Sequence, residues 1–149
     1  MDGFHIEPRF FDDKEPGRGM LYVLCPDSGK SFIDELARSD VGRLSRILVT
    51  AKRIYDYGCA FGFASQTIKR IEAGKCAVAV FEVRVKGTVI RVAAHIHNSA
   101  IPIYLFDFDT HQGARSRLPK RHIDHAKELA AIAAKCAEQF DFSDYRGAV

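Results

Sequence analysis

The chain has 149 residues, of which 47% are hydrophobic and 28% charged, and its formal net charge is +3. This length suits a single domain, 1–149, with its own core, and the composition is ordinary for a globular protein. No apolar run reaches the ~18 residues that a membrane span needs, and no secretory signal is recognisable, so we expect a cytoplasmic protein without a membrane partner.

Charge and cysteine placement bear on partners and cofactors. Residues 1–40 hold nine Asp/Glu against five Lys/Arg, whereas residues 41–149 hold 10 against 17. The basic remainder permits an anionic partner. The cysteines have no C-x-x-C spacing, so we expect buried, reduced thiols rather than a zinc or redox motif. They are Cys25, Cys59, Cys76 and Cys136.

The N-terminal part is predicted to be one strand followed by a helical hairpin. Residues 1–19 show no sustained period and are typical of a loose extension, and residues 20–25 form a short apolar strand. Ser31 and Asp40 are placed to cap two helices, the second of which ends at Gly58. The apolar stripe of this hairpin should pack on the back of the sheet.

The central part is predicted to be a loop and then an antiparallel meander. Residues 59–74 are expected to form a loop with one helical turn near its end. Residues 76–85 and 89–97 show the period of two that is typical of half-buried strands, and residues 101–109 are expected to form the third strand. We expect a polar front that is either plain surface or a working face. Its side chains would be Glu82, Arg84, Arg91, His95, His97, Asp107 and Asp109.

The C-terminal part is predicted to be a basic loop, a helix and a tail. Residues 110–120 are rich in cations, and Pro119 suits the first turn of a helix whose apolar stripe reaches Ala137. Residues 140–149 have no period and are expected to fray or to dock through their aromatic side chains. The predicted fold class is therefore α+β, with a small sheet, an N-terminal helical hairpin and a C-terminal helix.

Short motifs follow one another in a specific order along residues 20–135. They are Ser28-Gly29-Lys30-Ser31-Phe32, Leu36, Tyr57-Gly58, Phe81-Glu82-Val83-Arg84, Ile90-Arg91-Val92, Leu105-Phe106-Asp107-Phe108, Leu118-Pro119-Lys120 and Ile123-Asp124-His125-Ala126. This series resembles the RelE/ParE superfamily of bacterial toxins, and within it the HigB-like, phage-associated branch. The resemblance implies a RelE-like α+β fold with a small antiparallel sheet and a mixed edge.

The resemblance also implies a function. Members are toxins of type II toxin–antitoxin systems, and they act as ribosome-dependent mRNA endonucleases, or mRNA interferases. Such enzymes use no metal and no cofactor, because the ribose 2′-hydroxyl attacks the neighbouring phosphate while side chains move protons and cations stabilise the phosphorane. The implied partners are a cognate antitoxin, the ribosome and mRNA.

Two arginines and a histidine of the predicted sheet match this chemistry. Arg91 matches the strand arginine of the family, which implies phosphate and transition-state binding; the alternative is a surface arginine paired with Asp107 or Glu82. Arg84 matches the arginine of a Glu-Leu-Arg motif, where a supporting ion pair is the alternative. His95 is a candidate acid or base in the RNA reaction.

The chain departs from the family after Phe108, where close relatives often carry paired lysines. Asp109-Thr110-His111-Gln112 stands there instead, which places negative charge near the predicted site. His111 is a candidate proton carrier, and the longer basic segment can replace the missing cations, unless it is only a solvated loop. The candidate substrate-binding residues in it are Arg115, Arg117, Lys120 and Arg121.

Two other functions remain open at this point. The first is a non-catalytic RelE/ParE-fold module of phage origin that binds a protein, which the acidic Asp107 and Asp109 favour. The second is a metal-dependent hydrolase built on His95, His97 and Asp107, because an H-x-H pair on one strand with a nearby carboxylate can hold a transition metal.

Overall fold

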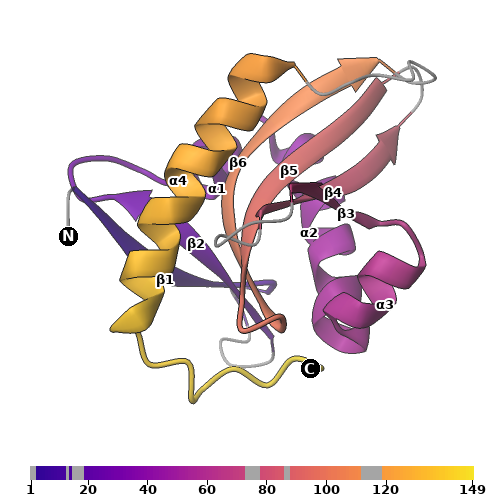
Figure 1. Ribbon diagram of the computed structural model, residues 1–149. Coiled ribbons are helices and arrows are strands. Elements are labelled where there is room, and N and C mark those ends of the chain that lie inside the picture. Colours follow the sequence, from indigo (N-terminus) through magenta and orange to yellow (C-terminus); the bar gives the residue numbers. More distant parts are fainter. Residues whose placement is uncertain (1–2, 13, 15–18, 73–77, 86–87, 112–118) are drawn as a thin grey trace.

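A mixed sheet with helices on both faces forms the body of the protein (Figure 1). The computed structural model describes residues 3–12, 14, 19–72, 78–85, 88–111 and 119–149. The elements in this part are β1 (Phe4–Phe10), β2 (Met20–Pro26), α1 (Phe32–Ser39), α2 (Val41–Tyr57), α3 (Cys59–Ala64), β3 (Ile68–Glu72), β4 (Val78–Val85), β5 (Thr88–His97), β6 (Ile101–His111) and α4 (Lys120–Glu138).

The strand order is β1-β2-β6-β5-β4-β3. Strands β2 and β6 run parallel, and all other neighbours are antiparallel. In the centre of the sheet, Glu82 of β4 pairs with Arg91 of β5, and Arg91 also pairs with Phe108 of β6. Directly paired residues put their side chains on one face, so these three stand in a row across β4, β5 and β6.

Helices α1, α2 and α3 cover one face of the sheet. Ser31 and Asp40 cap α1 and α2 as expected, because their side chains accept hydrogen bonds from the backbone amides of Asp34 and Arg43. The stripe of α2 packs on strand residues of this face, which confirms the predicted hairpin packing. Gly62 lets α3 approach β3, since an added Cβ would lie 2.3 Å from Ile68.

Helix α4 crosses the other face (Figure 1). Its small side chains sit against the centre of β5 and β6, so the helix approaches the sheet closely. The segment after α4 docks rather than frays, because Phe140 and Phe142 contact the ring of Tyr22 edge-on, at centroid distances of 5.3 and 5.1 Å. The packed α4 residues include Ala126, Leu129, Ala130, Ala133 and Ala137.

The structure corrects three predictions. The sheet is larger than expected, because the supposed loose extension contains edge strand β1 and the supposed loop supplies α3 and edge strand β3. Two strands therefore precede the helical hairpin, which is not the first structural unit. The polar front is also not a free surface, since α4 covers much of it. The α+β class, the three meander strands and the C-terminal helix are confirmed.

The structure describes one of the two expected turns of the meander. Asn98 and Ser99 have φ values of 51° and 59°, as a tight hairpin of type I′ requires. The second expected turn, Lys86-Gly87, lies outside the described residues, as does Cys76. No helix in the described part combines the length and hydropathy of a membrane span.

Candidate functional site

An ion cluster joins three strands on the α4 face, and we call it the Glu82 cluster. The carboxylate of Glu82 lies 3.2 Å from Nη2 of Arg91 and 2.7 Å from Nζ of Lys69. The Glu82 side chain is only 4% exposed, and that of Arg91 is 12% exposed. One carboxylate therefore holds two cations in place on this face of the sheet.

Beside this cluster, two phenylalanines of β6 meet two histidines of α4. The ring of Phe108 stacks on His122 with a centroid distance of 4.3 Å and an interplanar angle of 17°. The ring of Phe106 lies 4.6 Å from that of His125. We call these four residues the histidine–phenylalanine stack. Because Phe108 is the strand partner of Arg91, the stack adjoins the Glu82 cluster.

The surroundings of His122 favour its neutral form. Partial burial is the largest cause that lowers the pKa of His122, and the neighbouring Arg121 and His125 add to the effect. A neutral imidazole at pH 7 can accept a proton, as a general base must. The α4 end of the sheet therefore combines a fixed arginine, stacked rings and a proton acceptor.

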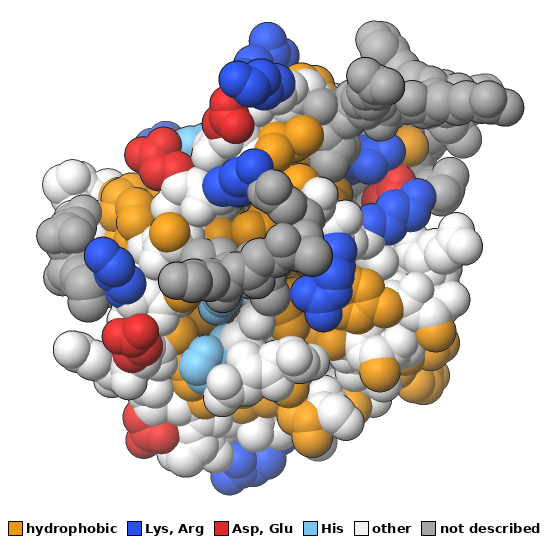
Figure 2. All heavy atoms as spheres, viewed as in Figure 1, with side chains coloured by type: hydrophobic (Ala, Val, Ile, Leu, Met, Phe, Trp, Pro, Cys, Tyr) orange, Lys and Arg blue, Asp and Glu red, His pale blue; other side chains and the backbone are white. Residues whose placement is uncertain are grey.

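Further cations surround this region. Lys120 and Arg121 form the first turn of α4, and the Lys120 side chain is 90% exposed, 3.7 Å from Asp124. Figure 2 shows Lys and Arg side chains at the end where α4 begins and along the β3–β5 side of the same face. Both predicted substrate-binding residues that the structure describes thus lie next to the histidine–phenylalanine stack.

The other predicted residues are placed only in part. Arg84 belongs to β4, opposite Val89, and His111 ends β6, but the side chains of both lie outside the described part. Arg115 and Arg117 also lie outside the described residues. Their proposed roles stay predictions.

His95 does not lie on an exposed face, contrary to our expectation. It is 6% exposed beneath α4, and its Nδ1 has no hydrogen-bond partner in the described part. Burial, with a smaller effect of His97, lowers the pKa of His95 to about 4. His95 is thus a neutral interior histidine, whereas His97 stacks on Phe142 at 4.6 Å.

The acidic residues of β6 lie on the opposite face of the sheet from Arg91, which corrects the predicted front. Arg43 of α2 binds both of them, with 2.5 Å to Asp107 and 2.6 Å to Asp109. We call these three residues the Asp107 cluster. A bulge at Leu105 places the two carboxylates on this face, because Ala93 pairs with Phe106 and Ala94 pairs with Tyr104, which leaves Leu105 as an extra residue. The extra residue reverses which side chains of β6 face α4.

The alternative metal site is not assembled. Asp107 points toward α2, while His95 and His97 lie on the α4 face. The three ligands of the hydrolase hypothesis are therefore separated by the sheet. The same separation removes Asp107 as a partner of Arg91, which binds Glu82 instead.

A cavity of about 480 Å³ opens at the edge of the sheet between α2 and the turn after α3. Arg46 and Arg53 line it, and neither forms an ion pair within the described residues. Thr50, Thr67 and Glu82 also line it. Glu82 thus lines this cavity and also belongs to the Glu82 cluster.

Sequence reasoning missed His122, His125 and Phe106 as site residues. A signal was present, because His122 and His125 are three residues apart and share a helical face next to the predicted basic segment. Their meeting with β6 depends on how α4 crosses the sheet, which residue spacing does not define.

Comparison with known proteins gives no relative. No protein-family model, curated protein or solved structure matches the chain. The functional interpretation therefore rests on the contacts of this chain. Among these contacts, the row from Glu82 through Arg91 and Phe108 to His122 places a carboxylate, a guanidinium group, a phenyl ring and an imidazole side by side.

Proposed function

We propose that this protein is a RelE-like mRNA interferase, the toxin of a type II toxin–antitoxin pair, and that it cleaves message on the ribosome without a metal. The observation that carries the proposal is the row on the α4 face, in which Arg91 stands beside Phe108 and Phe108 stacks on His122. Proteins that bind single-stranded RNA commonly combine aromatic rings, which stack on bases, with cationic side chains, which bind phosphates.

The chemistry assigns a role to each group. Arg91 binds the scissile phosphate and stabilises the added charge of the phosphorane. His122 accepts the proton of the 2′-hydroxyl, whose oxygen forms the new bond to phosphorus. The bond from phosphorus to the 5′-oxygen breaks, and His125 supplies the proton to that leaving oxygen. The products are a 2′,3′-cyclic phosphate and a free 5′-hydroxyl.

Two further observations support the proposal. The element series β2, α1, α2, β4, β5, β6 and α4 follows the order that the sequence resemblance implies, with β1, α3 and β3 added. The carboxylates at and near the position of the family lysines, Asp109 and Asp107, lie on the other face, where Arg43 binds them. The exposed Lys120 and Arg121 provide cations on the correct face.

Induced expression in a bacterial host tests the proposal. We expect the wild type to arrest growth and to produce discrete cuts in translated message, mapped by primer extension, and Arg91→Ala to do neither. A folded wild type that neither arrests growth nor cleaves ribosome-bound message would contradict catalysis. That result would favour the non-catalytic module, which binds an antitoxin-like protein without acting on RNA.

A further inference from the structure

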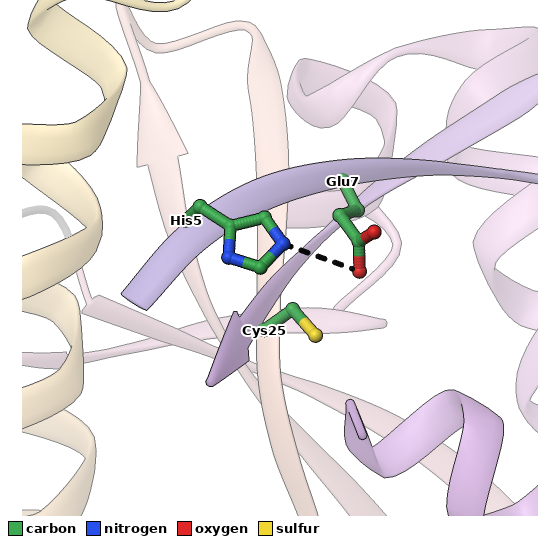
Figure 3. Close-up of side chains that lie close together, drawn as sticks. All are labelled: His5, Glu7 and Cys25. Carbon is green, nitrogen blue, oxygen red and sulfur yellow. Dashed lines mark ion pairs between the residues drawn. The ribbon is translucent and has the colours of Figure 1, made fainter. Parts of the chain in front are cut away.

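Three side chains of metal-ligand type lie together at the β1–β2 edge, which is the opposite edge of the sheet from β3. One ligand atom from each of His5, Glu7 and Cys25 lies within 4.8 Å of the others. Figure 3 shows the three side chains directed toward a common point, with the imidazole facing the carboxylate. The group is far along the sheet from Arg91, so it is a separate site.

The strand register produces this group. His5 of β1 lies directly opposite Cys25 of β2, and Glu7 is two residues further along β1, so all three share one face. Paired strands fix the positions of the Cα atoms, so the side chains need only small rotations to bring their ligand atoms to a common ion. The Cys25 side belongs to the interior, with 3% of the residue exposed, while His5 and Glu7 face solvent in part.

Asp27 orients the imidazole for this purpose. Its Oδ1 lies 2.5 Å from Nδ1 of His5, which places the Nδ1 proton in that hydrogen bond. The lone pair of Nε2 then faces Glu7, whose Oε2 is 3.5 Å away. This oxygen also accepts a hydrogen bond from Nη2 of Arg9 at 3.1 Å. A carboxylate behind a metal-bound histidine, as Asp27 would be here, is a common supporting arrangement.

The neighbouring charges leave room for a divalent ion. Arg9 contacts Glu7 at 3.1 Å, but its guanidinium also donates two hydrogen bonds to Asp34, at 2.9 and 2.8 Å. The Arg9–Asp34 pair is neutral as a unit. A thiolate and a carboxylate then balance the two charges of a metal ion.

We propose that His5, Glu7 and Cys25 bind one zinc ion, with Asp27 holding the imidazole and the fourth position open to water. A thiolate, an imidazole and a carboxylate suit zinc, whereas calcium and magnesium require oxygen ligands. Three protein ligands with one open position allow the ion to exchange and to bind a small ligand.

Zinc must displace a proton from the thiol. Burial, with the hydrogen bond to Glu7, raises the pKa of Cys25 to about 11. Binding of zinc as a thiolate complex therefore releases the proton of Cys25.

Titration of tag-free, chelator-treated protein with Co²⁺, followed by Zn²⁺, tests the proposal. We expect one Co²⁺ per chain, a thiolate-to-cobalt charge-transfer band, and displacement of Co²⁺ by one equivalent of Zn²⁺. Cys25→Ser should lose the band, and Asp27→Asn should weaken binding about 10- to 100-fold. Cys136→Ser is the matched control, since this thiol contacts β1 at the Phe4 carbonyl and should leave binding unchanged.

Two partly exposed ligands keep the test decisive if Cys25→Ser does not fold. His5→Asn and Glu7→Gln change side chains that are 44% and 32% exposed, so folded protein is expected from both. Each should lower the affinity at least tenfold. Unchanged affinity in either variant, a charge-transfer band in folded Cys25→Ser, or no saturable binding by the wild type would overturn the proposal. None of these results depends on RNA cleavage.

Discussion

Two arginine–carboxylate clusters stand on opposite faces of the same sheet, and their charges are opposite. In the Glu82 cluster one carboxylate holds Arg91 and Lys69, whereas in the Asp107 cluster Arg43 serves two carboxylates. Both arginines are largely buried, with side chains 12% and 19% exposed. By these contacts the first cluster holds two cations for one carboxylate and the second holds one cation for two carboxylates, so burial and pairing alone do not distinguish the two arginines.

The largest expected effect is the loss of cleavage on changing Arg91. Arg91→Ala should lower the rate of cleavage of ribosome-bound message about 10²- to 10³-fold, because it removes the cation that stabilises the phosphorane. The rate is measured on purified ribosome complexes. Arg43→Ala is the matched control, and it should cleave within a few-fold of the wild type. Equal losses in both variants would show that the two clusters do not differ in function.

Changing His122 should have the next largest effect. His122→Asn removes the proposed base and should slow cleavage about 10²-fold. In the wild type the rate should fall at acid pH, through the lowered pKa of His122, because only the neutral imidazole accepts a proton. A rate–pH profile measured in both proteins checks this. A wild-type profile without an acid limb would remove His122 from the reaction.

Arg43→Ala should act on stability instead. It leaves Asp107, 15% exposed, without its cation, and the free energy of unfolding should fall by about 1–3 kcal/mol. Urea unfolding followed by circular dichroism measures the change. Asp109→Asn, at an exposed carboxylate of the same cluster, is the control and should cost about 0.5 kcal/mol or less. A loss in Arg43→Ala no greater than that of the control would contradict the ion pair's structural role.

Protonation of His95 should lower the free energy of unfolding at acid pH. Its pKa is about 4 in the fold and 6.5 when unmodified by the fold, so the unfolded chain binds more protons between these values. Stability should be complete above pH 6.5 and decrease as the pH falls toward 4, by at most about 1.4 kcal/mol per unit. Urea unfolding at several pH values measures this slope, which His95→Leu should reduce. An unchanged slope would place the titrating group elsewhere.

The smallest effect concerns the exposed cations of α4. Lys120→Ala and Arg121→Ala should each weaken RNA binding a few-fold and reduce the slope of log affinity against log salt by about 0.7. Fluorescence anisotropy with a short single-stranded RNA measures both. Lys52→Ala, on the outer side of α2 and paired with Asp56, is the control and should leave the slope unchanged. Equal effects in all three would mean that binding is not directed to the α4 face.

Most helices and strands could be predicted from the sequence, because hydrophobic periodicity and helix caps depend on residues that are close together in the chain. The period of two predicted for β4 and β5 and the caps at Ser31 and Asp40 are found in the fold. Strand β1 was missed although Phe4 and Ile6 alternate with polar residues, since prolines, glycines and acids surround it. Pro8 is tolerated there because an edge strand leaves one side without ladder bonds.

The candidate site was less predictable for a physical reason. The bulge at Leu105 determines whether Asp107 or Phe108 lies opposite Arg91. No residue type in β6 predicts the position of this bulge. A strand without the bulge would have put carboxylates beside Arg91, as we had expected. The contact of His122 with Phe108 likewise depends on tertiary packing, and the side chains of Arg84 and His111 lie outside the described part.

The parallel pairing of β2 with β6 has a consequence for how the chain acquires its fold. Tyr22 lies beside Ile103, although α1 to α3 and most of the meander separate them in sequence. A contact between such distant segments requires the closure of a long loop, and the entropic cost of this closure slows folding. During synthesis the β1–β2 hairpin emerges early, but its inner edge stays unpaired until β6 has left the ribosome, so the sheet closes late and all at once.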